Sequence, residues 1–193
     1  MSDLNLTLAR TALLCLDMHN VIVERVPDGW REQVVGNVRR VLDAARTASL
    51  QVVYVAVARR REFMSPRNKF AGATGFVTNP AELARAMQIV DAVAPRDDEP
   101  IVRKPRISAF YGTELQSILA ARDMDTIVLT GVATNFVVES TARYAADADY
   151  RVIVLEDCCG AFVREEHESA IRSLDHLVEV ATSADFLASL PSR

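Results

Sequence analysis

The stretch DTIVLTGVATNFVVESTARYAADADY, residues 125–150, joins a buried strand to a helix through a turn of small residues. Residues 126–130 form a continuous aliphatic and β-branched run, which is typical of a strand covered on both faces in a parallel sheet. Gly131 opens a tight turn, and from Thr134 onward the apolar side chains recur at helical spacing. We expect Thr134 or Asn135 to cap this helix. Such a unit points backbone N–H groups at the sheet edge where open α/β sheets bind ligands.

The rest of the chain repeats this alternation of strand and helix. Apolar runs predict further strands at residues 11–16, 51–57, 99–104, 150–155 and 177–181. Helical spacing predicts helices that begin near residues 29, 80, 113, 164 and 183. Strands that alternate with helices indicate an α/β fold, a doubly wound parallel sheet between two layers of helices. No internal boundary interrupts the pattern, so we expect a single domain over residues 1–193.

Composition excludes several classes of function. The 193 residues carry a net charge of −4, which argues against a general nucleic-acid binder. No basic segment followed by a long apolar run opens the chain, and no apolar stretch is long enough for a membrane span. The three cysteines have neither the spacing of a metal site nor that of a disulfide framework. We therefore expect a cytoplasmic protein without a cofactor, a bound metal, or a membrane or nucleic-acid partner.

Two charged residues directly follow or end predicted strands. Asp17 follows the first, and Lys104 ends the third, flanked by Arg103 and Arg106. At the carboxyl edge of a parallel sheet, Asp17 could exchange protons with a ligand, and Lys104 could hold an anion or stabilise a carboxylate. Each also has an ordinary explanation, because an aspartate often caps a turn and a basic cluster is often a solvated loop.

Histidine and cysteine provide weaker candidates. His19 lies two residues after Asp17 and could face the same cleft, although a lone histidine is more often a hydrogen-bonded structural residue. No second histidine lies nearby in the sequence to complete a metal site. Cys158 and Cys159 follow the fifth predicted strand, but no base adjoins them, and free cysteine usually behaves as a small apolar residue.

Residues 59–79 show no clean period, yet they carry three consecutive arginines and several large apolar side chains. A long irregular segment in a compact domain is usually functional or lies at an interface. We expect a lid or a partner contact, and a homo-oligomer, because soluble monomers rarely expose so many apolar side chains.

Several segments together resemble the isochorismatase-like hydrolase superfamily, which includes isochorismatases, nicotinamidases and N-carbamoyl amide hydrolases. The matching segments are residues 13–18 (LLCLDM), 104–113 (KPRISAFYGT), 129–135 (LTGVATN), 139–142 (ESTA) and 154–157 (VLED). They follow the family's order along nearly the whole chain. The resemblance implies a six-stranded sheet with strand order 3-2-1-4-5-6 and assembly as a dimer or tetramer. It also implies a cis non-proline peptide bond in the turn at residues 132–134.

Most members of this superfamily work through an aspartate, a lysine and a cysteine. The aspartate matches Asp17 and the lysine matches Lys104, but the GVATNxC pattern reads GVATNFV here and places Val137 at the cysteine position. A valine has no nucleophilic atom, so the acyl-enzyme route is closed at this position. The histidine-rich metal motif of nicotinamidases is replaced by residues 57–61 (VARRR), which makes that activity a poor match.

Isochorismatases also lack the cysteine, and their proposed chemistry protonates a vinyl ether with the aspartic acid. We therefore predict hydrolysis of a small anionic metabolite at a vinyl ether or a related C–O or C–N bond. Asp17 would move the proton and Lys104 would stabilise charge. The other predicted substrate contacts are His19, Arg106, Ala133, Thr134, Asn135 and Phe136. Two alternatives remain: a non-catalytic member that binds a small molecule, and an amidase with another nucleophile such as Cys158.

Overall fold

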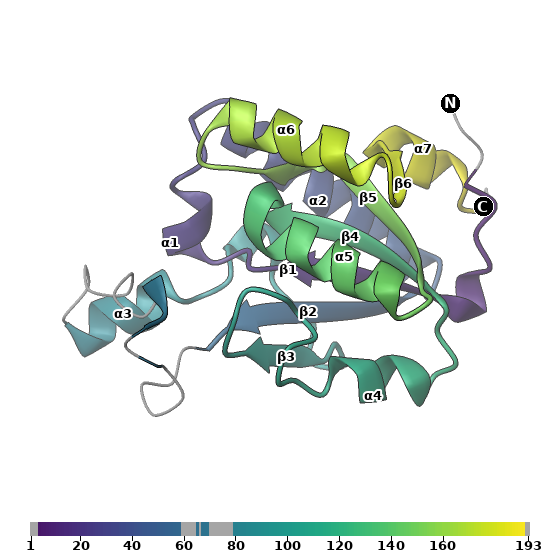
Figure 1. The fold of residues 1–193 in the computed structure, drawn as a ribbon, viewed down its shortest axis with the longest axis horizontal. Coiled ribbons are helices and arrows are strands. Elements are labelled where there is room, and N and C mark those ends of the chain that lie inside the picture. The colour runs from purple at the N-terminus through teal and green to yellow at the C-terminus, as the bar shows by residue number, and fades with distance from the viewer. Residues whose placement is uncertain (1–3, 59–64, 66, 70–78, 192–193) are drawn as a thin grey trace.

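A computed structural model describes residues 4–58, 65, 67–69 and 79–191, and most of the irregular segment at 59–79, with its expected lid or partner contact, lies outside them. Within the described residues the strands form one six-stranded sheet in the order β3-β2-β1-β4-β5-β6, with every neighbouring pair parallel (Figure 1). The strands are β1 Thr11–Leu16, β2 Gln51–Val57, β3 Ile101–Lys104, β4 Thr126–Val132, β5 Arg151–Gly160 and β6 Glu179–Ala181. The expected strand order is confirmed.

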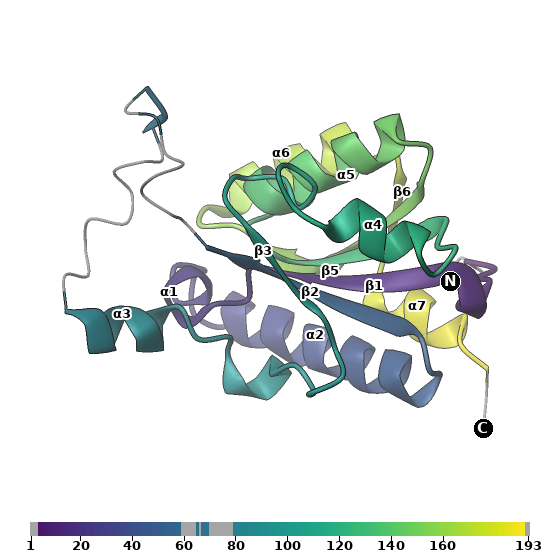
Figure 2. The same cartoon turned by 90° about the horizontal axis from the view of Figure 1, so that it is seen from below.

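Helices cover both faces of this sheet, which confirms the expected three-layer α/β/α arrangement (Figure 2). One face carries α2 (Trp30–Thr47) and α7 (Ser183–Ala188). The other carries α4 (Leu115–Ala120), α5 (Glu139–Asp147) and α6 (Arg164–Leu174). Two short helices, α1 (Asn20–Val23) and α3 (Pro80–Ala86), lie beyond the carboxyl ends of the central strands. Among the described helices, none combines the length and apolar character of a membrane span.

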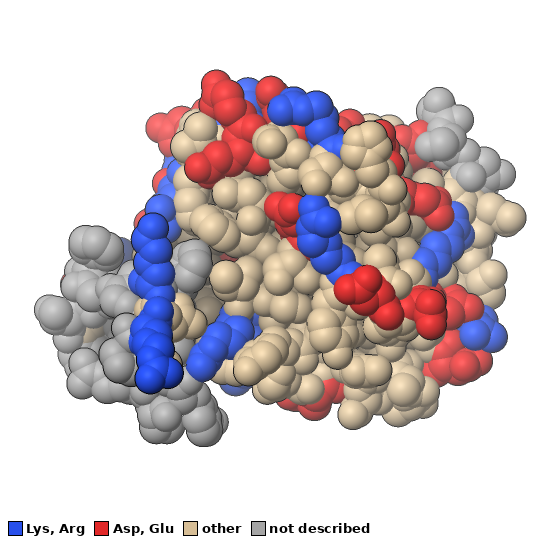
Figure 3. Space-filling model, in the orientation of Figure 1, with Lys and Arg blue, Asp and Glu red and all other residues tan. Residues whose placement is uncertain are grey.

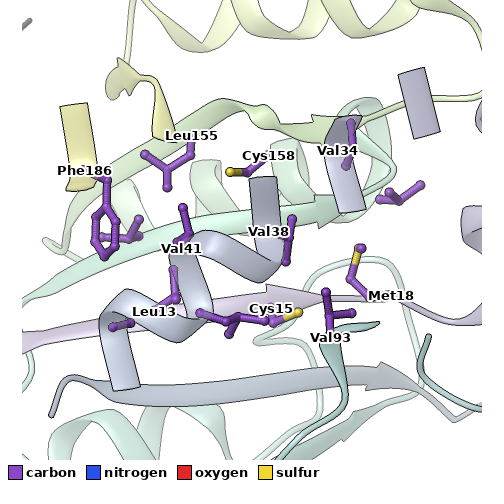
Figure 4. Close-up of a cluster of buried hydrophobic side chains, with 14 of the residues drawn as sticks. Leu13, Cys15, Met18, Val34, Val38, Val41, Val93, Leu155, Cys158 and Phe186 are labelled. Carbon is purple, nitrogen blue, oxygen red and sulfur yellow. The ribbon is translucent and has the colours of Figure 1, made fainter. Parts of the chain in front are cut away.

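Two apolar layers explain why the central strands read as continuous apolar runs. Leu13 and Cys15 of β1 face α2 and pack in a layer that includes Val38 and Phe186 (Figure 4). The alternate residues of β1, including Leu14, belong to the layer under α4, α5 and α6. Because successive side chains of a strand point to opposite faces, burial of both faces buries every residue of β1.

Strand β5 extends further than the sequence pattern predicts. We expected it to end at Leu155, but it continues to Gly160 beyond an irregularity in its pairing with β4, between Leu129 and Gly131. Cys158 and Cys159 therefore lie inside the strand and face opposite apolar layers. The prediction that they follow the strand is wrong, because the polar residues before them looked like the start of a loop.

The helix after β4 begins with a wider turn than expected. Residues Thr134–Val138 form one π-helical turn before α5, and Ala133 precedes that turn without a side-chain cap. The hydroxyl of Thr134 instead forms a hydrogen bond with Nδ1 of His167, at 2.8 Å. The predicted capping role of Thr134 is therefore wrong, since a partner from α6 takes its hydroxyl.

Candidate functional site

Asp17 is placed at the carboxyl edge by a sharp change of backbone direction after β1. Its φ of 50° lies in the left-handed region, which aspartate tolerates better than most residues. Its N–H donates to the carbonyl of Val55 at 2.9 Å, so β2 holds the turn in place. The residue is buried, with 6% of its surface exposed. The carboxylate is therefore fixed at the sheet edge and largely removed from water.

Lys104 reaches Asp17 from the end of β3, across the end of β2. Adjacent strands lie about 4.8 Å apart, so two strand spacings need a long side chain to cross them. The Nζ of Lys104 lies 2.8 Å from Oδ2 of Asp17, and their side chains are 3% and 8% exposed. The ammonium also donates to the carbonyl of Arg106 at 2.9 Å. The two charges stabilise each other, because removal of either one would leave the other buried and unpaired and would strongly destabilise the folded protein.

The turn after β4 lies beside Asp17 because β4 approaches β1 very closely at Gly131. Gly131 pairs with Leu16 and has a φ of 133°, and a Cβ there would lie 2.1 Å from the carbonyl oxygen of Leu16. Only glycine fits this position. The Val132–Ala133 peptide bond that follows is cis, as the resemblance implies.

Val137, at the family's cysteine position, contributes no reactive group. Its side chain is 1% exposed and belongs to the apolar layer under α5. The chain's own cysteines are also buried, and burial raises the pKa of Cys15 to about 12 and raises the pKa values of Cys158 and Cys159 as well. A raised pKa leaves little thiolate at neutral pH, so the geometry does not favour any of these thiols as a nucleophile.

His19 lies close to Asp17, but backbone groups take both of its ring nitrogens. Its Nε2 accepts from the N–H of Val57 at 3.1 Å, and its Nδ1 contacts the carbonyl of Met87. The residue is 3% exposed, and burial lowers its pKa below the ordinary value. These contacts commit the polar atoms of His19 to the fold.

Residues of α6 form hydrogen bonds with the polar side chains of the turn after β4, and Trp30 of α2 packs behind one of them. Besides the bond from Thr134 to His167, Nδ2 of Asn135 donates to Oε2 of Glu166 at 3.0 Å. The ring of His167 also lies edge-on to Trp30, with 5.2 Å between ring centroids. Sequence reasoning missed His167 and Trp30, because no local pattern links them to this turn.

Backbone amides of this turn are partly used as well. The N–H groups of Phe136 and Val138 both donate to the carbonyl of Ala133, at 3.1 and 3.3 Å. The ring of Phe136 packs on that of Phe162, with 6.1 Å between centroids. The N–H of Phe136, one of the predicted substrate contacts, is therefore already used within the turn.

Positive charge gathers on the side of the molecule where the site lies. Figure 3 shows a row of Lys and Arg side chains on the left of the view, the side toward which β2 ends, and others at the top, centre and right. Arg106 belongs to the loop after β3, where its Nη1 donates to the carbonyl of Pro105 at 2.9 Å. A basic surface beside a buried carboxylate favours anionic ligands.

Comparison with known proteins identifies the family. The isochorismatase domain matches residues 11–185. The chain belongs to the isochorismatase family. An uncharacterised isochorismatase family protein, YwoC of Bacillus subtilis (strain 168), is 33% identical over 190 residues, 97% of each chain. The ureidoacrylate amidohydrolase RutB of Stutzerimonas stutzeri (strain A1501) is 31% identical over 173 residues, covering 77% of this chain and 69% of its own.

A solved structure supports the same assignment. The cysteine hydrolase from Pseudomonas syringae pv. phaseolicola 1448A superposes with a TM-score of 0.82 at 26% identity, covering 96% of this chain and 94% of its own. This chain is therefore a hydrolase of the isochorismatase family, and it has a valine at position 137.

Proposed function

We propose that this hydrolase adds water across a C–O or C–N bond of a small anionic metabolite without a protein nucleophile. The observation that carries the proposal is the contact of 2.8 Å between Asp17 and Lys104, buried at the carboxyl edge of the sheet, in a chain that has a valine at position 137. Such a pair can move a proton and stabilise charge, and the valine at position 137 has no atom that could form an acyl-enzyme.

In this mechanism the carboxylate of Asp17 takes a proton from the attacking water. The water oxygen bonds to the electrophilic carbon, and the proton passes to the leaving oxygen or nitrogen. With a vinyl ether the order is reversed: Asp17 in its protonated form gives its proton to the terminal vinyl carbon, and water adds to the resulting oxocarbenium carbon and returns a proton to Asp17. The hemiketal then collapses to a ketone and an alcohol. Lys104 holds the carboxylate in place and offsets negative charge that develops on the substrate.

Anionic substrates are favoured by the charge around the site. The described residues near the pair include Arg103 and Arg106, on either side of Lys104. Because Lys104 already faces Asp17, a further cation is needed to bind a substrate carboxylate, and Arg106 is our candidate for that role. Backbone groups at Ala133, Thr134 and Asn135 stay our candidates for the reacting end of the substrate.

The test is an unbiased screen for metabolite depletion with the wild type, Asp17→Asn and Glu99→Gln. Glu99→Gln makes the same carboxylate-to-amide change in a buried ion pair with Arg46, away from the site. We expect one or a few small anions to disappear with the wild type and Glu99→Gln but not with Asp17→Asn. Tight binding of an anion without turnover would support the alternative of a non-catalytic binding protein.

We also propose a cytoplasmic homo-oligomer, a dimer or tetramer, with a small molecule as the only other partner. Exposed aromatic residues support association: Tyr111 is 62% exposed, and Tyr144, 42% exposed, stacks on Phe110 with 4.7 Å between ring centroids. Light scattering on the purified protein should return a multiple of 21.3 kDa, and a monomer mass alone would contradict this.

A further inference from the structure

Three segments that are distant in the sequence meet at the ring of His19. The Nε2 atom accepts from Val57, the last residue of β2, at 3.1 Å. The Nδ1 atom bonds to the carbonyl of Met87, just after α3. His19 itself follows β1 by three residues. One buried side chain thus joins the carboxyl ends of two central strands to the segment at Met87.

These two partners determine the state of the ring. A carbonyl oxygen can only accept, so Nδ1 must carry a proton, and a backbone N–H can only donate, so Nε2 must be bare. A neutral imidazole with its proton on Nδ1 satisfies both bonds. A doubly protonated ring would place an N–H of His19 against the N–H of Val57 and lose that bond.

The same segments carry the catalytic pair. The N–H of His19 donates to the carbonyl of Asp17 at 2.8 Å. Val57 pairs in register with Lys104, and the N–H of Ala58 donates to the Lys104 carbonyl at 2.9 Å. A shift of Val57 away from the ring would therefore move Lys104 relative to Asp17.

Neighbouring hydrogen bonds extend the contact at Met87 into a longer pairing between residues 18–20 and residues 87–90, which we call the seam. The N–H of Asn20 donates to the carbonyl of Gln88 at 3.0 Å, and the N–H of Val90 donates to the carbonyl of Met18 at 2.9 Å. His19 and Ile89 also form a short antiparallel bridge. The ring of His19 connects this seam to β2.

We propose that His19, as a neutral imidazole protonated on Nδ1, is a positioning residue that sets the separation of Asp17 and Lys104. Its ring bonds to the backbone of Val57 and Met87, and it therefore acts on the pair through the segments that carry Asp17 and Lys104. Its effect on turnover rests on the function proposed above, whereas its effect on the geometry of the sheet edge does not.

The groups around the His19 ring shift its pKa, so its two hydrogen bonds depend on pH. Burial lowers the pKa of His19, Asp17 and the Met87 carbonyl act in the opposite direction, and Lys104 and Arg103 lower it further. The described charged groups that act on the ring are Asp17, from the end of β1, and Lys104 and Arg103, from β3. Arg85 and Asp91 flank the segment at Met87 in the sequence.

The sign of the effect follows from the lowered pKa. Below its ordinary value of 6.5 the unfolded chain gains a proton on His19 before the native protein does. Native stability from this group is therefore complete above pH 6.5 and falls as the pH drops toward the native pKa. Once the native ring is protonated, the bond to Val57 is lost, and we expect turnover to fall with it.

Nitrogen NMR of the imidazole rings tests the state of His19 directly. The chain has three histidines, so His167→Gln and His176→Gln assign the spectrum. We expect the His19 ring to be neutral with its proton on Nδ1 at pH 7.5. The amide shifts of Val57 and Lys104 should titrate together with it, below pH 6.5. A ring that is protonated on Nε2, or that titrates without moving these amides, would overturn the proposal.

Two substitutions test the role in turnover. His19→Gln supplies one acceptor and one donor that do not titrate, so it should keep kcat within about threefold and remove the loss of activity that accompanies His19 protonation. His19→Leu fills the space without hydrogen bonds and should lower kcat about 10–100-fold with KM nearly unchanged, as expected for misplaced groups. His176→Gln, on an exposed residue, is the matched control and should match the wild type.

The outcomes separate the two proposals. If Asp17→Asn abolishes turnover but His19→Leu keeps the wild-type kcat, the proposed function holds and the role of His19 is wrong. If the screen finds no turnover, the ring state and the coupled shifts of Val57 and Lys104 still decide the positioning role. If His19→Leu does not fold, the pH profile of His19→Gln decides it, because a retained titration in that variant would exclude His19 as its origin.

Discussion

Two ion pairs in this protein have similar geometry and burial, but we assign them different roles. Lys104 and Asp17 lie 2.8 Å apart at the carboxyl edge of the sheet, with side chains 3% and 8% exposed. Arg46 and Glu99 also lie 2.8 Å apart, with side chains 10% and 8% exposed, near the amino end of β3. Distance and burial therefore do not distinguish them.

Their partners do. Glu99 accepts two bonds from Arg46, each of 2.8 Å, and a third from the N–H of Arg96 at 2.8 Å. Arg46 also donates to the hydroxyl of Tyr54 and the carbonyl of Ala94. This pair fastens α2 to β2 and to the loop before β3, so its role is structural. A buried ion pair indicates a functional site only when it also lies where a ligand can reach.

Breaking the pair of Asp17 and Lys104, to which we assign catalysis, should have the largest effect. Lys104→Met leaves the carboxylate of Asp17 buried without its cation, which costs about 3–5 kcal/mol of unfolding free energy. Loss of the charge that stabilises the reaction should also lower kcat about 10²–10³-fold. Urea denaturation and steady-state kinetics measure the two effects. The double variant Asp17→Asn with Lys104→Met removes both charges, and it should recover stability but not activity. Recovery of turnover in the double variant would contradict the account.

Breaking the structural pair should affect stability alone. Glu99→Gln removes the nearer of the two carboxylates that contact Arg46, and Asp43 stays at 3.7 Å, so we expect a loss of about 1–3 kcal/mol with kcat within twofold of the wild type. Burial alone would raise the pKa of Glu99, but the bonds from Arg46 and Arg96 lower it below its ordinary value of 4.5. Its contribution is therefore complete above pH 4.5 and is lost as the pH falls through the native pKa. Denaturation curves of the two proteins should converge in acid, and a difference that persists there would contradict this.

The smallest expected effect concerns the thiols. Cys15, Cys158 and Cys159 are all buried, with raised pKa values. Native protein should take up no iodoacetamide at pH 8 and keep full turnover, whereas urea-unfolded protein should take up three equivalents. Mass spectrometry counts the labels. Labelling of Cys158 in parallel with loss of activity would revive the alternative of a substitute nucleophile.

Much of the sheet edge could be predicted from the sequence. Buried parallel strands read as apolar runs, and Asp17 and Lys104 stand at the ends of two of them. The family's strand order then brings those ends together, as the 2.8 Å contact bears out. The partners of His19 could not be predicted, because Val57 and Met87 lie 38 and 68 residues away in the sequence. The hydrogen bond between Thr134 and His167 could not be predicted for the same reason, because it depends on how α6 packs against the turn.

The position of the cysteines could not be predicted for a different reason. The polar pair Glu156 and Asp157 suggested the end of a strand, yet the backbone continues through an irregularity in the pairing of β4 and β5. Asp157 is accommodated there because it accepts bonds from the N–H and hydroxyl of Ser183, at the start of α7. Tertiary packing thus overrides a local signal for a loop.

The most direct test of the central claim is the kcat of Asp17→Asn on the substrate found by depletion. It should be compared with the wild type and Glu99→Gln, at one pH and at a temperature where all three are folded. The amide preserves the shape of the side chain and cannot take up the proton of water. We predict a loss of about 10²–10⁴-fold for Asp17→Asn and none for Glu99→Gln. Wild-type turnover by Asp17→Asn would contradict the account and place the chemistry elsewhere in the molecule.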